Sequence, residues 1–237
     1  MTVVRLVAMT ATGHDGVVIE ACVFDLDGVL IDSEPVWEQV RRQLVDERHG
    51  RWPPEAQARL MGMNTDEWAR YLSHDLGVGL APDQVADLVV DRMVERYAQR
   101  LPVMPGAVDA VRRVASRWPI AIASSSPRRL IDAALATMGM VGLFTATIST
   151  DEVGRGKPAP DVYLAAADRL GVPAPRCAAV EDSTNGLRSA LGAGLLTIAV
   201  PHARYPPDAS VLGQAALVLG SLSDLTVGAI ESIGPSS

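Results

Sequence analysis

Two hydrophobic patterns divide the chain. Short continuous apolar runs lie at 17–24, 120–123, 144–149, 177–180 and 195–200, with a weaker one at 216–219, and such runs predict buried strands. Apolar residues spaced three or four positions apart fill the intervals 107–117, 127–138, 160–170 and 183–193, and a last such segment starts at 221. Because strands that alternate with helices form parallel sheets covered on both faces, the pattern predicts a doubly wound α/β fold.

Residues 33–103 carry helical spacing without a strand pattern. Ser33 and Pro35 predict the start of a helix that reaches about 48, and Thr65 predicts the N-cap of a later one. Further helices are expected at 55–60 and 82–99. Since this block follows the first strand, we expect an inserted helical domain at 33–103. The remaining expected parts are an α/β core domain at 17–32 and 104–237 and a loose tail at 1–16.

Composition narrows the possible partners. The 237 residues are 48% hydrophobic and carry a net charge of −7, which argues against a nucleic-acid-binding protein. No apolar stretch is long enough to predict a membrane span. The two cysteines, Cys22 and Cys177, lie in strand-like runs, so we expect buried thiols and a reducing cytoplasm.

The first strand ends in two carboxylates, Asp25 and Asp27, followed by Gly28. A turn at Gly28 can bring both acids to the crevice where open α/β sheets bind ligands. Two close carboxylates repel one another unless a cation or a shared proton intervenes, which favours magnesium. Asp-x-Asp-Gly also occurs in ordinary turns without a catalytic role. The residues at the ends of the other strands therefore decide between a turn and a catalytic site.

Polar groups follow three more strands at the same predicted edge: Ser124, Lys157, and Glu181 with Asp182. The four segments are Phe24-Asp25-Leu26-Asp27-Gly28, Ala123-Ser124-Ser125, Gly156-Lys157-Pro158 and Val180-Glu181-Asp182-Ser183. With these motifs in this order, the chain resembles the haloacid dehalogenase superfamily of phosphohydrolases over about 17–233. The helical block matches the cap domain of relatives similar to β-phosphoglucomutase and phosphoglycolate phosphatase.

The resemblance implies a covalent mechanism. Asp25 would attack the phosphoryl group and form an aspartyl phosphate. Asp27 would protonate the leaving oxygen and then activate water. The magnesium ligands implied by the resemblance are Asp25, the backbone carbonyl of Asp27, Asp182, and Glu181 through water.

The same resemblance assigns contacts to the phosphoryl group. Ser124 would donate to its oxygens, and the Ser125 backbone amide would assist. Asn185 either hydrogen-bonds near the phosphate or caps the following helix. Lys157 is the only lysine among 21 lysine and arginine residues. This bias suggests that a compact ammonium is needed between nucleophile and phosphoryl oxygens, where a planar guanidinium would not fit.

The cap segment bears on the substrate. Trp37 stands where similar mutases carry a histidine, and the loop with Gly62 and Met63 offers no charge for a second phosphate. These departures favour hydrolysis over isomerisation. Trp37, Gly62 and Met63 would shape the substrate pocket, although ordinary cap packing explains Trp37 and Met63 equally well.

The sequence thus predicts a magnesium-dependent phosphatase acting on a small phosphate monoester of a sugar, polyol or similar metabolite. We expect a cytoplasmic monomer or homodimer. A phosphosugar mutase of the same superfamily is the first alternative. A phospho-aspartate signalling module or a ligand-binding relative is the more remote one, since Asp27 and the inserted helices speak against a receiver domain.

Overall fold

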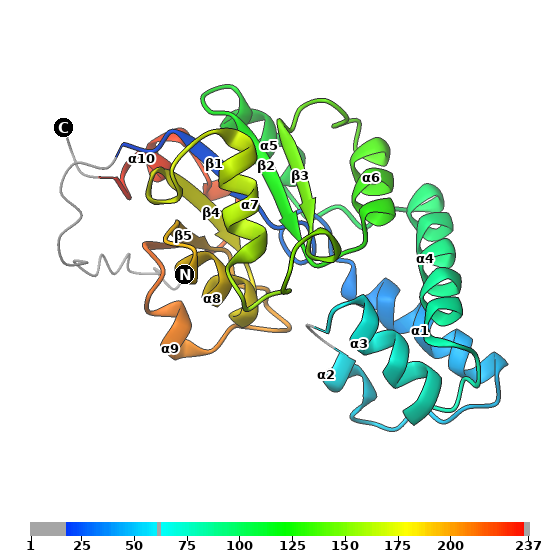
Figure 1. The fold of residues 1–237 in the computed structure, drawn as a ribbon. Coiled ribbons are helices and arrows are strands. Elements are labelled where there is room, and N and C mark those ends of the chain that lie inside the picture. The colour runs from blue at the N-terminus through cyan, green and yellow to red at the C-terminus, as the bar shows by residue number, and fades with distance from the viewer. Residues whose placement is uncertain (1–17, 61–62, 235–237) are drawn as a thin grey trace, which may run out of the picture.

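A parallel sheet organises the chain. The computed structural model describes residues 18–60 and 63–234, and within them six strands pair in the order β3-β2-β1-β4-β5-β6, all parallel (Figure 1). The strands are β1 (Ala21–Phe24), β2 (Ile120–Ser124), β3 (Ala146–Ser149), β4 (Cys177–Glu181), β5 (Leu196–Ala199) and β6 (Leu217–Val218). The predicted order of elements along the chain is confirmed.

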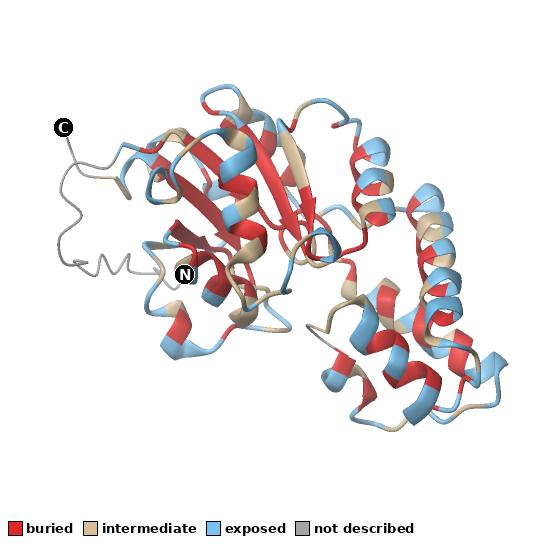
Figure 2. Cartoon of the chain, viewed as in Figure 1, coloured by how far each residue is buried: buried red, intermediate tan, exposed pale blue. Residues whose placement is uncertain are grey.

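Helices cover both faces of this sheet, as the sequence predicts. Because side chains alternate along a strand, Ala21 and Val23 of β1 pack on the face covered by α7 (Asp161–Leu170) and α8 (Thr184–Gly192). Cys22 and Phe24 pack on the other face, towards α5 (Ala107–Ala115), α6 (Arg128–Thr137) and α10 (Val227–Glu231). Strands β1, β2, β4 and β5 are buried along their length, whereas β3 is buried only at its carboxyl end (Figure 2). The helices around the sheet are α5 (Ala107–Ala115), α6 (Arg128–Thr137), α7 (Asp161–Leu170), α8 (Thr184–Gly192), α9 (Ala209–Leu212) and α10 (Val227–Glu231). Short 3₁₀ turns lie at Thr150–Glu152, Ala174–Arg176 and Leu222–Asp224.

A separate group of helices lies beside the carboxyl ends of the strands (Figure 1). Its members are α1 (Glu34–Glu47), α2 (Ala56–Leu60), α3 (Thr65–Arg70), the π-helix Tyr71–Asp75 and α4 (Pro82–Gln99). An antiparallel bridge between Ile31 and Val103 joins the two connections to this group. We refer to residues 33–103 as the cap; their independence as a domain stays a prediction.

Local details differ from the sequence predictions at the cap helices. Asn64, not Thr65, is the N-cap of α3: its side chain accepts from the Glu67 amide, and Glu67 accepts from the Asn64 amide, which is a capping box. Ser33 precedes α1 but makes no side-chain cap, because its hydroxyl donates to Asp27 instead. The predicted tail at 1–16 and Gly62 lie outside the described residues.

Candidate active site

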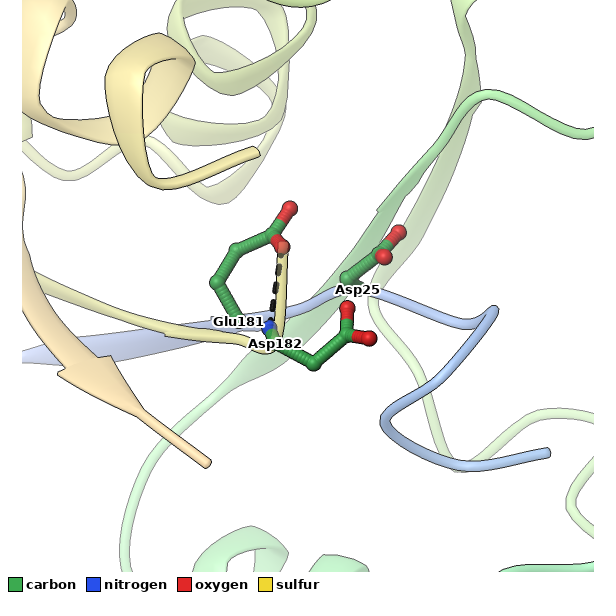
Figure 3. Close-up of side chains that lie close together, drawn as sticks. All are labelled: Asp25, Glu181 and Asp182. Carbon is green, nitrogen blue, oxygen red and sulfur yellow. Dashed lines mark hydrogen bonds between the residues drawn. The ribbon is translucent and has the colours of Figure 1, made fainter. Parts of the chain in front are cut away.

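Three carboxylates meet where β1 and β4 end. Phe24 is in register with Val180, and the Asp25 amide donates to the Val180 carbonyl at 3.0 Å, which sets Asp25 beside the residues that follow Val180. Asp25, Glu181 and Asp182 are all buried, and each offers a carboxylate oxygen within 4.8 Å of the others. Figure 3 shows the Asp25 and Asp182 carboxylates facing one another while Glu181 folds back towards the Asp182 amide.

Two glycines make room for these acids. Gly28 has φ of +81°, a left-handed conformation, and a Cβ at this position would overlap with the Asp182 carboxylate. A Cβ on Gly186, in the first turn of α8, would overlap with the Glu181 carboxylate. The close approach of backbone to carboxylate therefore requires glycine at both positions.

Lys157 connects two of the acids. Its Nζ lies 2.9 Å from Asp25 Oδ1 and 2.6 Å from Glu181 Oε1, and its side chain is 6% exposed. Burial alone would lower the pKa of Lys157, but Asp25 and Glu181 outweigh burial and raise it. Lys157 is thus a fixed positive charge beside the predicted nucleophile.

The Glu181 carboxylate is held by direct contacts. Its Oε1 accepts from Lys157 and from the Tyr163 hydroxyl, the latter at 2.7 Å. Its Oε2 accepts from the Asp182 and Ser183 amides at 3.1 and 3.3 Å. The sequence predicts a role for Glu181 through water, whereas its geometry shows a buried carboxylate that orients Lys157. Tyr163, in the first turn of α7, gave no signal in the sequence because an apolar-face tyrosine of a helix has an ordinary packing explanation.

The site fits a cation. Burial, more than any neighbouring charge, raises the pKa of Asp25 to about 8, although Lys157 acts in the opposite direction. Burial and the charges of Glu181 and Asp25 raise the pKa of Asp182 well above its usual range. Asp182 Oδ1 is buried without a hydrogen-bond partner among the described residues. An orphaned carboxylate oxygen beside two more acids matches the oxygen ligands that magnesium takes.

Asp27 is held by three hydroxyls. Ser33 donates to Oδ1, while Ser124 and Ser126 donate to Oδ2 at 3.1 and 2.8 Å. Ser124, predicted to bind the phosphoryl oxygens, is fully buried behind Asp27, whereas Ser125 and Ser126 line the cleft. Ser33 and Ser126 are site residues that the sequence analysis did not assign, because a serine before a helix has the ordinary explanation of a cap.

A model of the haloacid dehalogenase-like hydrolase family matches residues 19–194, which include every strand-end residue described above. The chain belongs to this hydrolase family. A probable pseudouridine-5'-phosphatase of Drosophila melanogaster is 33% identical over 214 residues, covering 86% of this chain and 90% of that protein. Hexitol phosphatase B of Escherichia coli K12 is 30% identical, covering 88% of this chain and 95% of that protein.

Solved structures of the hydrolase family share the fold. CbbY from Rhodobacter sphaeroides in complex with phosphate has a TM-score of 0.78 and 27% identity, covering 90% of this chain and 99% of that one. β-Phosphoglucomutase from Clostridium difficile has a TM-score of 0.77 at 22% identity and covers 91% of this chain and 96% of that one. The family resemblance stated from the four motifs is confirmed.

The acids of this hydrolase open into a cleft of about 480 Å³ between the sheet edge and the cap. Predicted pocket residues that line it are Trp37, Met63, Ser125 and Asn185. The cleft is also lined by Arg41 of α1 and by His202 and Tyr205 of the loop after β5, to which the sequence analysis assigned no role. Ser183, whose hydroxyl accepts from the Gly186 amide, is the N-cap of α8.

Proposed function

We propose that this hydrolase is a magnesium-dependent phosphatase that cleaves a small phosphate monoester, of a sugar or polyol, through an aspartyl-phosphate intermediate. The observation that carries the proposal is the placement of the Asp25 carboxylate, the Lys157 ammonium and the Asp27 carboxylate in one cleft. The hexitol and pseudouridine-5'-phosphatases among the relatives support this substrate class.

In the first step an Asp25 oxygen forms a bond to phosphorus while the bond from phosphorus to the ester oxygen breaks. Asp27 gives its proton to the departing oxygen, so an alcohol leaves. In the second step Asp27 takes a proton from water. The water oxygen bonds to phosphorus, and the bond from phosphorus to Asp25 breaks, releasing inorganic phosphate and restoring the free carboxylate.

The residues around Asp27 prepare it for both steps. Three serine hydroxyls hold its carboxylate in one orientation, and a fixed orientation lowers the entropic cost of proton transfer. Because Ser33 precedes α1, the first cap helix, the acid is tied directly to the start of the cap. Closure of the cap over the cleft would exclude water until an alcohol is bound.

A magnesium ion would be held by Asp25, Asp182 and the Asp27 backbone carbonyl, with Glu181 behind them. When bound, it supplies positive charge that stabilises the phosphoryl oxygens. Lys157 adds a second positive charge at Asp25 and favours the ionised nucleophile. Ser125 and Asn185 also line the cleft and are proposed to donate to the phosphoryl oxygens, while the Ser126 hydroxyl stays with Asp27.

The cellular setting is proposed on the cysteines and the chemistry. Cys22 and Cys177 are buried free thiols, which suits a reducing cytoplasm. Among the described residues, no helix is both long and apolar enough to cross a membrane. We propose a monomer or a homodimer, which sedimentation of the native chain distinguishes.

The deciding experiment measures phosphate release from a panel of monoesters with magnesium or with EDTA. Native protein, Asp25→Asn and the control Asp168→Asn, an exposed acid of α7, are compared. We expect release only with magnesium, no release by Asp25→Asn and full activity of the control. Release by Asp25→Asn at the native rate contradicts a covalent route through Asp25. Conversion of one sugar phosphate into another would instead support the mutase.

A further inference from the structure

A buried arginine of the cap lines the cleft. Arg41 of α1 is 5% exposed and lines the cleft. Its guanidinium carbon lies 4.3 Å from the ring centroid of Trp37 and 5.1 Å from that of Trp68. Arginine is rarely buried to this extent unless it is paired, so the burial of Arg41 raises the question of which groups accept its N–H donors.

Arg41 has no hydrogen-bonding partner in the described part of the chain. Its buried Nε has no hydrogen-bond partner, and no ion pair or hydrogen bond joins the guanidinium to residues 18–60 or 63–234. The two indole rings interact with the guanidinium through its charge, but they accept none of its five N–H bonds. The Nε–H, and the other N–H donors as far as the described residues go, are therefore available to a molecule in the cleft.

The charge of Arg41 is balanced locally. Burial lowers its pKa to about 10, while Glu34 and Asp27 act in the opposite direction, so the guanidinium is charged at neutral pH. Glu34 lies two helical turns before Arg41 on α1 and lines the same cleft. His202, which also lines the cleft, lies 3.6 Å from Asp32. The cap side of the cleft thus carries no surplus positive charge for a second anionic group.

We propose that Arg41 determines specificity by donating hydrogen bonds to hydroxyl oxygens of a neutral, polyhydroxylated leaving group. The inference rests on the proposed phosphatase function. It selects monoesters of sugars and sugar alcohols over esters that carry a carboxylate or a second phosphate. Trp37, Leu60 and Met63 line the same cleft and provide apolar contact for the carbon chain of such an alcohol.

The test compares Arg41→Met with Arg42→Met, an exposed arginine on the same helix. Methionine keeps an apolar side chain of similar length against Trp37 and Trp68. The substrates are sorbitol 6-phosphate, which has several hydroxyls, and p-nitrophenyl phosphate, which has none on its leaving group. We expect Arg41→Met to lower kcat/KM for the sorbitol ester by about 10- to 100-fold, the loss of a charged hydrogen bond. The aryl ester is expected to change by less than about threefold, and Arg42→Met to resemble native protein on both esters.

Equal losses on both esters, or no loss on the sorbitol ester, would overturn the role of Arg41. A second measurement uses native protein alone, so it stands even where Arg41→Met does not fold. Native protein is expected to prefer sorbitol 6-phosphate over 2-phosphoglycolate and over fructose 1,6-bisphosphate by about tenfold or more in kcat/KM. A preference for either of the more anionic esters overturns the inference while leaving the phosphatase intact. The absence of phosphate release from every ester with magnesium is a different outcome, since it contradicts the proposed function itself.

Discussion

The backbone of Gly28 lies directly against the carboxylate of Asp182, so that a side chain on the glycine would occupy the space of the acid. This contact joins the turn after β1 to the end of β4. It also ties the turn that follows Asp27, the proposed acid and base, to Asp182, the proposed metal ligand. A single methyl group added at position 28 would therefore displace the Asp182 carboxylate, although Gly28 has no side chain to take part in the reaction.

Gly28→Ala is expected to lower kcat by about tenfold or more, because the Asp182 carboxylate has to move. Its left-handed φ of +81° adds backbone strain of about 1–3 kcal/mol. The matched control is Gly139→Ala, which has φ of +65° and no atom within 4 Å of an added Cβ. Steady-state kinetics and thermal melts check both variants. Comparable losses of activity in the two would show that strain, not the contact with Asp182, is responsible.

Lys157→Arg is expected to lower kcat by about a hundredfold or more although the charge is kept. The Lys157 ammonium reaches Asp25 and Glu181 at 2.9 and 2.6 Å in a nearly closed space, which a planar guanidinium does not fit. The control is Arg155→Lys, since Arg155 pairs with Asp161 on the surface two residues away. Initial rates at saturating ester measure the effect, and near-native activity of Lys157→Arg would contradict the need for an ammonium.

The sequence predicts the sheet and the acids well because both depend on local patterns. Each apolar run ends at its polar group, and parallel strands bring such ends to one edge, so Asp25, Lys157 and Asp182 could be expected together. Partners contributed by other elements could not be expected. The sequence pattern of Ser33 predicts a helix cap, yet its hydroxyl donates to Asp27. The sequence analysis assigned no role to Arg41, yet its guanidinium packs against Trp37 and Trp68. Such contacts depend on how the cap packs, which short-range periodicity does not encode.

The thermal stability of the protein with and without divalent cations tests whether Asp25, Glu181 and Asp182 form a metal site. Magnesium is expected to raise the thermal midpoint of native protein, since a ligand that binds only the folded state stabilises it. Asp182→Asn is expected to abolish this increase, because its buried Oδ1 is the oxygen left without a partner. Asp168→Asn serves as the control. An undiminished magnesium-dependent increase in Asp182→Asn would contradict its assignment as a ligand.

The buried thiols give a pH dependence of stability. Burial, reinforced by Cys177, raises the pKa of Cys22, and burial raises that of Cys177 to about 11. The folded state thus keeps protons that the unfolded chain loses above its ordinary thiol pKa of about 8.5, so stability falls as pH rises. Between pH 8 and pH 10 the loss from Cys22 is expected to be about 2 kcal/mol. Urea unfolding of native protein and Cys22→Ala checks this, and an equal pH dependence in both would exclude the thiol as the cause.

Ser33→Ala tests whether the hydroxyls around Asp27 serve proton transfer. Without the Ser33 donor, the Asp27 carboxylate keeps Ser124 and Ser126 on Oδ2 but loses its contact on Oδ1. We expect kcat for an alkyl phosphate to fall by about tenfold, because in the proposed mechanism the alkoxide leaves with a proton from Asp27. p-Nitrophenyl phosphate, whose leaving group needs less protonation, is expected to lose much less. Ser73→Ala is the control, as this buried cap hydroxyl donates to the Leu80 carbonyl and does not contact Asp27. An equal loss on both esters would mean that Ser33 supports the fold of the cleft and not the acid.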